Sequence, residues 1–236
     1  MSETIDAWMT PEQYVTEIGR YRDWLGSLWT QYYKACQLKF TRDDMTGRVV
    51  SRANWILDNL MNWAGEDLSL VAYCTRSLFE LVVILWSVDR SDDWERQFGL
   101  AATDLTDCVK TVIKQRTGHE EEGRQNLVDL KQAYEQIGLV VPETWQRIRT
   151  EAGNAGYSQE YDEVFQLLSK YVHSTPMVLF SPRIDAQNLN KLRTYFLDKA
   201  VEYLHTAYCL AAEQSGYNPA EIDVAAELAR LRAELA

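Results

Sequence analysis

The sequence predicts an all-α protein. Its 236 residues include only eleven glycines and five prolines, and no stretch shows the strict apolar–polar alternation of a half-buried strand. Apolar residues recur instead at helical spacing along most of the chain. We expect a single helical bundle of about nine helices, in which residues 1–218 form the helical domain and residues 219–236 a C-terminal amphipathic helix.

Three helices are expected in the N-terminal third of the chain. The stretch 10–13, Thr-Pro-Glu-Gln, combines a cap, a proline at the first position and a capping-box glutamine, so it should start a helix that runs to about Lys39. A second helix, at about 42–63, presents apolar residues on one face. The third, 68–86, is apolar on every side except for one charged pair, as expected of a helix at the centre of a core.

Glycines, prolines and capping residues divide the rest of the chain. Six further helices are expected, at about 94–117, 120–137, 142–153, 158–173, 186–214 and 220–235. In the last of these, Val224, Leu228, Leu231 and Leu235 follow the spacing of a coiled-coil seam. This stripe makes the C-terminal helix a candidate contact in a homo-oligomer, the alternative being that it packs on its own domain.

Charge and cysteine usage exclude several classes of protein. The net charge of −11 and a pI near 4.8 argue against nucleic acid and anionic membranes as partners. The four cysteines are too far apart in the sequence for a zinc site or a redox pair. The N-terminus lacks the features of a signal peptide, and charges interrupt the one long apolar stretch. We therefore expect a cytoplasmic protein without a cofactor.

The most informative feature is the charged pair Arg76 and Glu80, one helical turn apart within the apolar stretch 68–86. Burying either charge alone would cost several kcal/mol, so each should pair with the other or with polar groups from elsewhere. A second polar group closes the expected seventh helix, where Ser169, Tyr171 and His173 lie within two turns. The two groups are expected to form one buried network.

Together, these two motifs are similar to those of a known family. The Arg-Ser-Leu-Phe-Glu stretch at 76–80 is followed, roughly 80 residues later, by Tyr161 and then by Leu-Ser and Val-His-Ser. In this order they resemble an all-helical prokaryotic family, domain of unknown function 5677. The resemblance covers roughly residues 60–208, and its anchors are Arg76, Glu80, Tyr161, Ser169 and His173. It implies a fold but no reaction, because that family has no established activity.

Three functions fit these residues. The favoured one is a binding or interaction scaffold of a prokaryotic stress or defence type, with a protein as a candidate partner, in which the network fixes the docking of two helices. Tyr161, Ser169 and Tyr171 are its candidate binding residues. The second is a hydrolase or nuclease with His173 as general base, Glu80 as its orienter and Arg76 as the oxyanion or phosphate contact.

The third function is a metal-binding helical bundle. Glu202 and His205 form a Glu-x-x-His step of the kind found in di-iron bundles. Such sites need a second copy of the step, which this chain lacks, so a metal would have to be shared with Glu80 and His173. Glu202 and His205 are therefore weak candidates, and no metal site is predicted.

Overall fold

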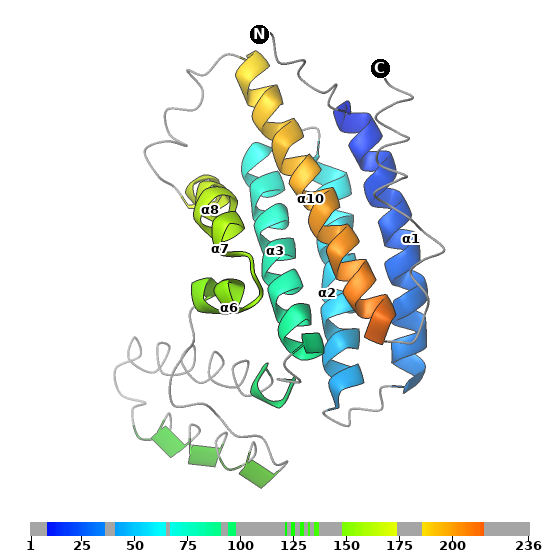
Figure 1. Ribbon diagram of the computed structural model, residues 1–236, viewed down its shortest axis with the longest axis vertical. Helices are drawn as coiled ribbons and strands as arrows, with labels where there is room; N and C mark the ends of the chain where they lie inside the picture. Colours follow the sequence, from blue (N-terminus) through cyan, green and yellow to red (C-terminus); the bar gives the residue numbers. More distant parts are fainter. Residues whose placement is uncertain are drawn as a thin grey trace.

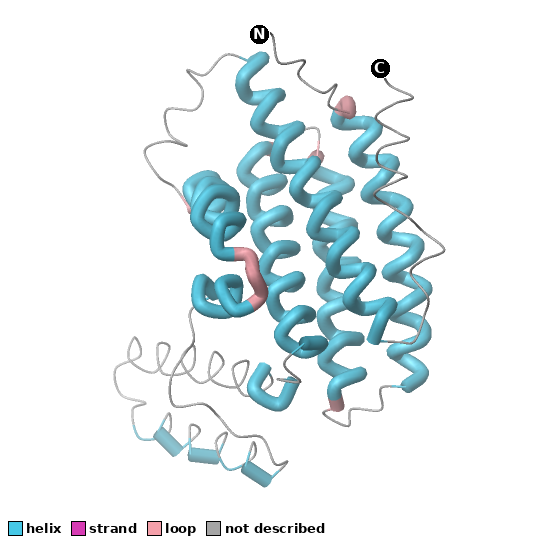
Figure 2. Tube along the Cα trace, viewed as in Figure 1, coloured by secondary structure: helices cyan, strands magenta, loops and turns pink. Residues whose placement is uncertain are grey.

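The computed structural model describes residues 9–35, 41–64, 67–90, 94–97, 148–173 and 186–214, together with isolated positions between 121 and 136. Every regular element in these ranges is helical, as Figure 2 shows, so the all-α prediction is confirmed for the part of the chain that is described. Seven α-helices and one π-helical segment are present there.

Four long helices lie side by side in Figure 1: α1 (Pro11–Ala35), α2 (Arg42–Trp63), α3 (Leu68–Arg90) and α10 (Ala186–Gln214). Helix α1 packs on α2, α2 on α3, α3 on α10 and α10 back on α1. We call this arrangement the four-helix ring. Four short elements lie beside α3 outside it: α6 (Ile148–Asn154), α7 (Ser158–Glu160), the π-helical segment η1 (Tyr161–Phe165) and α8 (Gln166–Val172).

The helix count differs from the prediction of about nine. The helices expected at 94–117, 120–137 and 220–235 fall largely or wholly outside the described residues, as does the boundary at 218, although the positions described within the first two are helical. The helix expected at 158–173 consists of α7, η1 and α8 in succession. Over five residues its backbone hydrogen bonds follow the π-helical pattern, which the spacing of apolar residues in the sequence does not predict.

Side-chain caps explain where two of the long helices begin. The backbone N–H of Thr10 donates to Gln13 Oε1 at 2.6 Å, and that of Gln13 donates to Thr10 Oγ1 at 3.4 Å, which confirms the expected capping box. Before α3, Asp67 Oδ1 accepts from the backbone N–H groups of Ser69 and Leu70 at 2.7 and 3.2 Å. These bonds satisfy donors that a helix start otherwise leaves unpaired.

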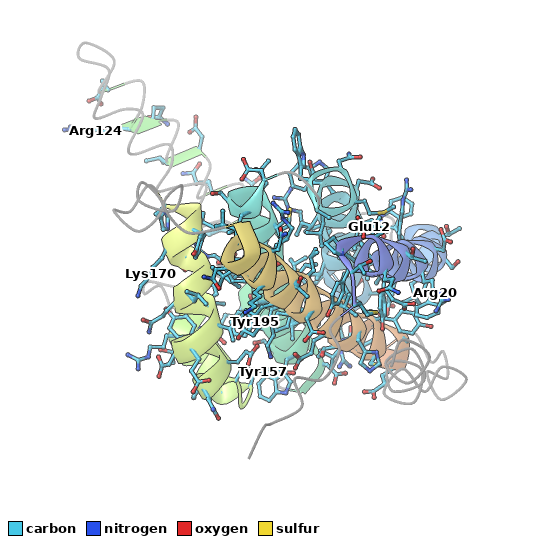
Figure 3. The ribbon with its side chains drawn as sticks, turned by 90° about the horizontal axis from the view of Figure 1, so that it is seen from above. Glu12, Arg20, Arg124, Tyr157, Lys170 and Tyr195 are labelled. Carbon is cyan, nitrogen blue, oxygen red and sulfur yellow. The ribbon has the colours of Figure 1, made fainter. Side chains whose placement is uncertain are left out.

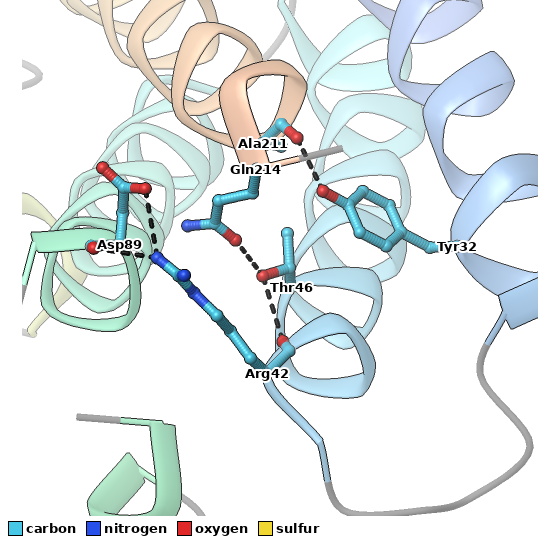
Figure 4. Close-up of polar contacts among 6 residues, drawn as sticks. All are labelled: Tyr32, Arg42, Thr46, Asp89, Ala211 and Gln214. Carbon is cyan, nitrogen blue, oxygen red and sulfur yellow. Dashed lines mark hydrogen bonds and ion pairs between the residues drawn. The ribbon is translucent and has the colours of Figure 1, made fainter. Parts of the chain in front are cut away.

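Polar side chains tie the four long helices together at one end of the ring (Figure 4). Tyr32 of α1 donates to the backbone carbonyl of Ala211 in α10 at 2.6 Å. Arg42 of α2 donates to the backbone carbonyl of Asp89 in α3 at 2.8 Å. The hydroxyl of Thr46 in α2 donates a hydrogen bond to the side chain of Gln214, the last residue of α10. Each bond joins two different helices, so together they fix the register of the ring at this end.

Phe79 joins the short elements to the ring. Its fully buried side chain contacts the rings of Tyr157, Phe165 and Tyr203, with centroids 6.1, 5.5 and 5.4 Å away. These partners come from the α6–α7 loop, from η1 and from α10. In the view from above, Lys170 lies on the outer side of α8, away from α10 (Figure 3). The apolar side of the short elements therefore packs inward around Phe79.

Helix α3 is long and apolar enough to cross a membrane, with a mean hydropathy of 1.8 over the span Leu68–Asp89. It contacts α2 and α10 within the ring, and α6 and α8 outside it. A helix covered by its own chain on several sides has the environment of a core helix rather than of a lipid-facing one.

Replacing each of two glycines by alanine should change the free energy of unfolding in opposite directions. Gly156, with φ +83°, follows α6, and the next backbone N–H, of Tyr157, donates to the carbonyl of Ala152 at 2.7 Å, as in a Schellman motif. Gly26 lies inside α1, and both glycines have open space where a Cβ would be. Gly156→Ala should cost about 1 kcal/mol through its left-handed backbone, whereas Gly26→Ala should stabilise by about 0.5–1 kcal/mol. Urea unfolding of both variants checks this, and equal signs would contradict it.

Candidate functional site: a cleft at Arg76 and His173

The predicted charged pair forms on α3. Arg76 Nη2 lies 3.3 Å from Glu80 Oε1, one helical turn away. The pair is not sealed in the core, because 24% of the Arg76 side chain and 37% of the Glu80 side chain are exposed. The expectation that the charged pair lies in a buried network is therefore wrong for one face of α3, where Tyr73 and Ser77 line the same opening.

Arg76 also reaches His173 at the end of α8. Its Nη1 lies 3.3 Å from His173 Nε2. A guanidinium can only donate hydrogen bonds, so a hydrogen bond between these two atoms requires Nε2 to be the acceptor. Arg76 thus stands between a carboxylate and an imidazole and contacts both. No direct contact joins Glu80 to His173.

An aromatic stack on η1 supports the same guanidinium. Arg76 Cζ lies 4.7 Å from the centroid of the Phe165 ring. The ring of Tyr161 stacks on Phe165 with centroids 4.7 Å apart and an interplanar angle of 19°. Tyr161 therefore reaches the site through ring packing, and the stack holds Arg76 from the side of the short elements.

The two other residues expected at this site lie apart from His173. The hydroxyl of Ser169 donates at 2.7 Å to the carbonyl of Phe165, one turn earlier at the end of η1. Tyr171 is buried with its ring edge against Phe196, at a centroid distance of 5.4 Å. Its hydroxyl has no hydrogen-bond partner among the described residues. Neither side chain lines the opening at Arg76.

Glu202 and His205 do not converge on a common point. Glu202 accepts from Lys199 Nζ at 2.8 Å. His205 lies beside Cys209, with a ring nitrogen 3.6 Å from its Sγ, and beside the ring of Tyr21. Within the described ranges no three His, Cys, Asp or Glu side chains are placed to hold a metal ion. The chemistry of these donors gives no reason to place a metal there.

A cleft of about 370 Å³ opens over the Arg76 network. Helix α3 forms its floor, while α2 and the end of α8 form its two walls. It is lined by Arg52, Ile56, Tyr73, Arg76, Ser77, Glu80, Leu81, Ile84, Val172 and His173. A concave site with an apolar lining and a few convergent polar groups is the usual form of a small-ligand pocket.

Sequence reasoning missed three polar residues of this cleft. Tyr73 and Ser77 share a face of α3 with Arg76, so helical spacing could have found them. Arg52 lies on the neighbouring helix and stacks over the ring of Trp55, with its Cζ 4.0 Å from the centroid. Only the packing of α2 against α3 brings it to the cleft, and the sequence does not specify that packing.

The cleft carries a small positive excess in an acidic protein. Two arginines, Arg52 and Arg76, and one glutamate, Glu80, are among the residues that line it. One positive charge is therefore left over, in a chain with a net charge of −11. Arg76 already contacts Glu80, whereas Arg52 forms no ion pair with any other described residue.

Glu80 should make the stability of the protein depend on pH. Burial raises the pKa of its carboxyl above the ordinary value, and Arg76 opposes part of that rise. The folded protein therefore holds a proton at Glu80 more tightly than the unfolded chain does. The resulting stabilisation is complete below the pKa of the unfolded chain and is lost as pH rises through the raised folded value.

We expect the free energy of unfolding of the wild type, measured relative to Glu80→Gln, to be highest below the ordinary pKa of a glutamate and to fall as pH rises above it. Urea unfolding at a series of pH values measures this difference. Ser77→Ala, on the same face but unable to titrate, should shift the stability by a constant amount. A difference for Glu80→Gln that rises with pH would contradict the prediction.

No family model, curated protein or solved structure shows a significant match to the chain. The resemblance to domain of unknown function 5677 therefore stays a prediction. The cleft, with its two arginines and its apolar lining, is the feature on which a function can be based.

Proposed function

We propose that the protein is a binding protein, built as a single helical bundle, which holds a small ligand in the cleft over Arg76. The observation that carries this proposal is the opening itself, in which charged, hydroxyl and apolar side chains from α2, α3 and α8 converge. A network that served only to fix α8 on α3 would not need a cavity beside it. Its arginine would also be expected to be fully covered.

Binding is favoured over general-base catalysis by the order of the three groups. A histidine base needs a free nitrogen to accept the proton, and a carboxylate usually orients it through the other nitrogen. Here His173 Nε2 already accepts from Arg76, and Glu80 binds the guanidinium rather than the imidazole. The hydrolase alternative retains one favourable observation, the exposure of His173 at the cleft.

A test of the proposal uses a variant that fills the cleft. Ile84 is partly exposed and lines the opening, so Ile84→Trp should occupy the space without removing a charge. The wild type should gain thermal stability with at least one of four small aromatic compounds that carry no charge, a positive charge, one negative charge or two. Ile84→Trp should lose that gain. The proposal fails if no compound stabilises the wild type, or if the filled variant responds equally.

Two wider aspects complete the proposal. A cytoplasmic location and a role in prokaryotic stress or defence agree with the acidic composition and with the resemblance at 76–80. Homo-oligomers are expected to form through residues 219–236, which lie outside the described residues. Sedimentation of the full chain and of a chain ending at residue 218 should then give different masses. Equal masses would remove the C-terminal helix from the proposal.

A further inference from the structure

We infer that the cleft selects a small monoanion, with a carboxylate or a singly charged phosphate group joined to an apolar body. This inference rests on the proposed binding function and specifies the ligand class for the same cleft. Four features carry it: an uncompensated guanidinium, neutral donors, a nearby carboxylate and an apolar lining.

Arg52 is the primary partner for the anion. Arg52 is one of the residues that line the cleft, and its side chain has no ion pair or hydrogen bond with another residue in the described part of the chain. The planar fork of a guanidinium matches the two oxygens of a carboxylate or phosphate. The Trp55 ring, 4.0 Å from Cζ, restrains the side chain before a ligand arrives, which reduces the entropy lost on binding.

Arg76 contributes in a different way, because two of its nitrogens are already engaged with Glu80 and His173. Its contact with Nε2 holds the imidazole of His173 beside the cleft. Tyr73 and Ser77 add two hydroxyl groups, neither of which is hydrogen bonded to another described side chain. These groups can bind an oxyanion without adding charge.

Glu80 limits the charge of the ligand. Its carboxylate lines the same cleft, and 37% of its side chain is exposed. A second negative charge on the ligand would approach this carboxylate in a chain that is already strongly acidic. A cation would instead meet two guanidiniums. The arrangement therefore favours one negative charge over two, and over a positive charge.

The apolar lining defines the rest of the ligand. Leu81, Ile84 and Val172, from α3 and α8, line the opening, and the fully buried Ile56 of α2 lies behind them. The volume of about 370 Å³ lies near the lower end of the roughly 300–1,000 Å³ typical of ligand pockets. A compact apolar group, such as one aromatic ring, suits this space better than a long chain.

Titration calorimetry on the full chain tests this ligand class with matched probes. Phenylacetate and methyl phenyl phosphate, a phosphodiester with a single charge, have the required chemistry and distinguish a carboxylate source from a phosphate source. Phenethylamine replaces the negative charge by a positive one, phthalate carries two negative charges and acetate lacks the ring. We expect phenylacetate or methyl phenyl phosphate to bind at least about 10-fold more tightly than each of the other three.

Arg52→Gln should weaken binding of the preferred probe by about 10- to 100-fold, the range expected when a charge-assisted hydrogen bond is lost. Arg48→Gln is the matched control, because Arg48 lies one turn away on α2, does not line the cleft and pairs with Asp44. It removes the same charge and should change the affinity by less than about 2-fold. Circular dichroism of each variant confirms that it is folded.

The outcomes separate this inference from the proposed function. If phenethylamine or phthalate binds as tightly as phenylacetate, or if Arg52→Gln retains full affinity, the monoanion class is overturned. The binding function then still stands, provided that Ile84→Trp abolishes that binding. If neither these probes nor the uncharged aromatic compound binds to the wild type, or if all bind to Ile84→Trp as tightly as to the wild type, the cleft is not a ligand site and both proposals fall.

Discussion

Phe79→Ala is expected to lower the free energy of unfolding by about 3–5 kcal/mol. The Phe79 side chain is fully buried and contacts three rings that come from different elements of the fold. Removing it deletes the transfer free energy of a large apolar group and leaves a cavity whose walls belong to separate elements. Urea or thermal unfolding followed by circular dichroism measures the loss.

The control for this prediction is Tyr73→Ala on the same helix. Tyr73 is 37% exposed, so its truncation should cost about 1 kcal/mol or less. If Phe79→Ala is too unstable to purify, Phe79→Leu should show a smaller loss in the same direction. Equal losses for Phe79→Ala and Tyr73→Ala would mean that Phe79 does not join the short elements to the ring.

Glu151→Ala should cost about 2–3 kcal/mol. Glu151 is a residue of α6 that is only 7% exposed. Its Oε1 accepts from Arg96 Nη2 at 2.7 Å, and its Oε2 accepts from Ser87 Oγ of α3 at 3.4 Å. Alanine would leave the largely buried guanidinium without this carboxylate and would break the polar link between α6 and α3.

Two variants separate the charge of Glu151 from its position. Glu151→Gln retains a hydrogen-bond acceptor, so its loss should lie between those of the wild type and the alanine variant. Glu163→Ala removes an exposed glutamate of η1 and should change stability by no more than about 0.5 kcal/mol. The interpretation fails if Glu151→Ala is as stable as Glu163→Ala in urea unfolding.

The sequence was most informative where local chemistry determines the structure. The bounds expected for α2 and α10 agree with those observed, and the cap of α1 forms as predicted by Thr10 and Gln13. All of these features depend on residues within one or two turns of each other. The π-helical segment was not predicted, because the positions of Tyr161 and Phe165 fit an ordinary helix equally well.

The site was predictable only in part for the same reason. The contact between Arg76 and Glu80 follows from their spacing on one helix. The contact between Arg76 and His173 joins residues 97 positions apart and depends on how α8 packs on α3. Spacing within each helix could not show which of the three groups lies in the middle. It also could not show that Arg52 of the neighbouring helix reaches the same opening.

The two walls of the cleft are attached to the molecule in different ways. Helix α2 belongs to the ring, where Arg42 and Thr46 tie its first turns to α3 and α10. Helix α8 lies outside the ring and packs on α3 and, through Tyr171, on α10. Leu168 and Tyr171 of α8 are buried in the same core as the ring residues. One side of the cleft, with Arg52, is therefore built by the ring itself, and the other, with His173, depends on the packing of a short helix attached from outside.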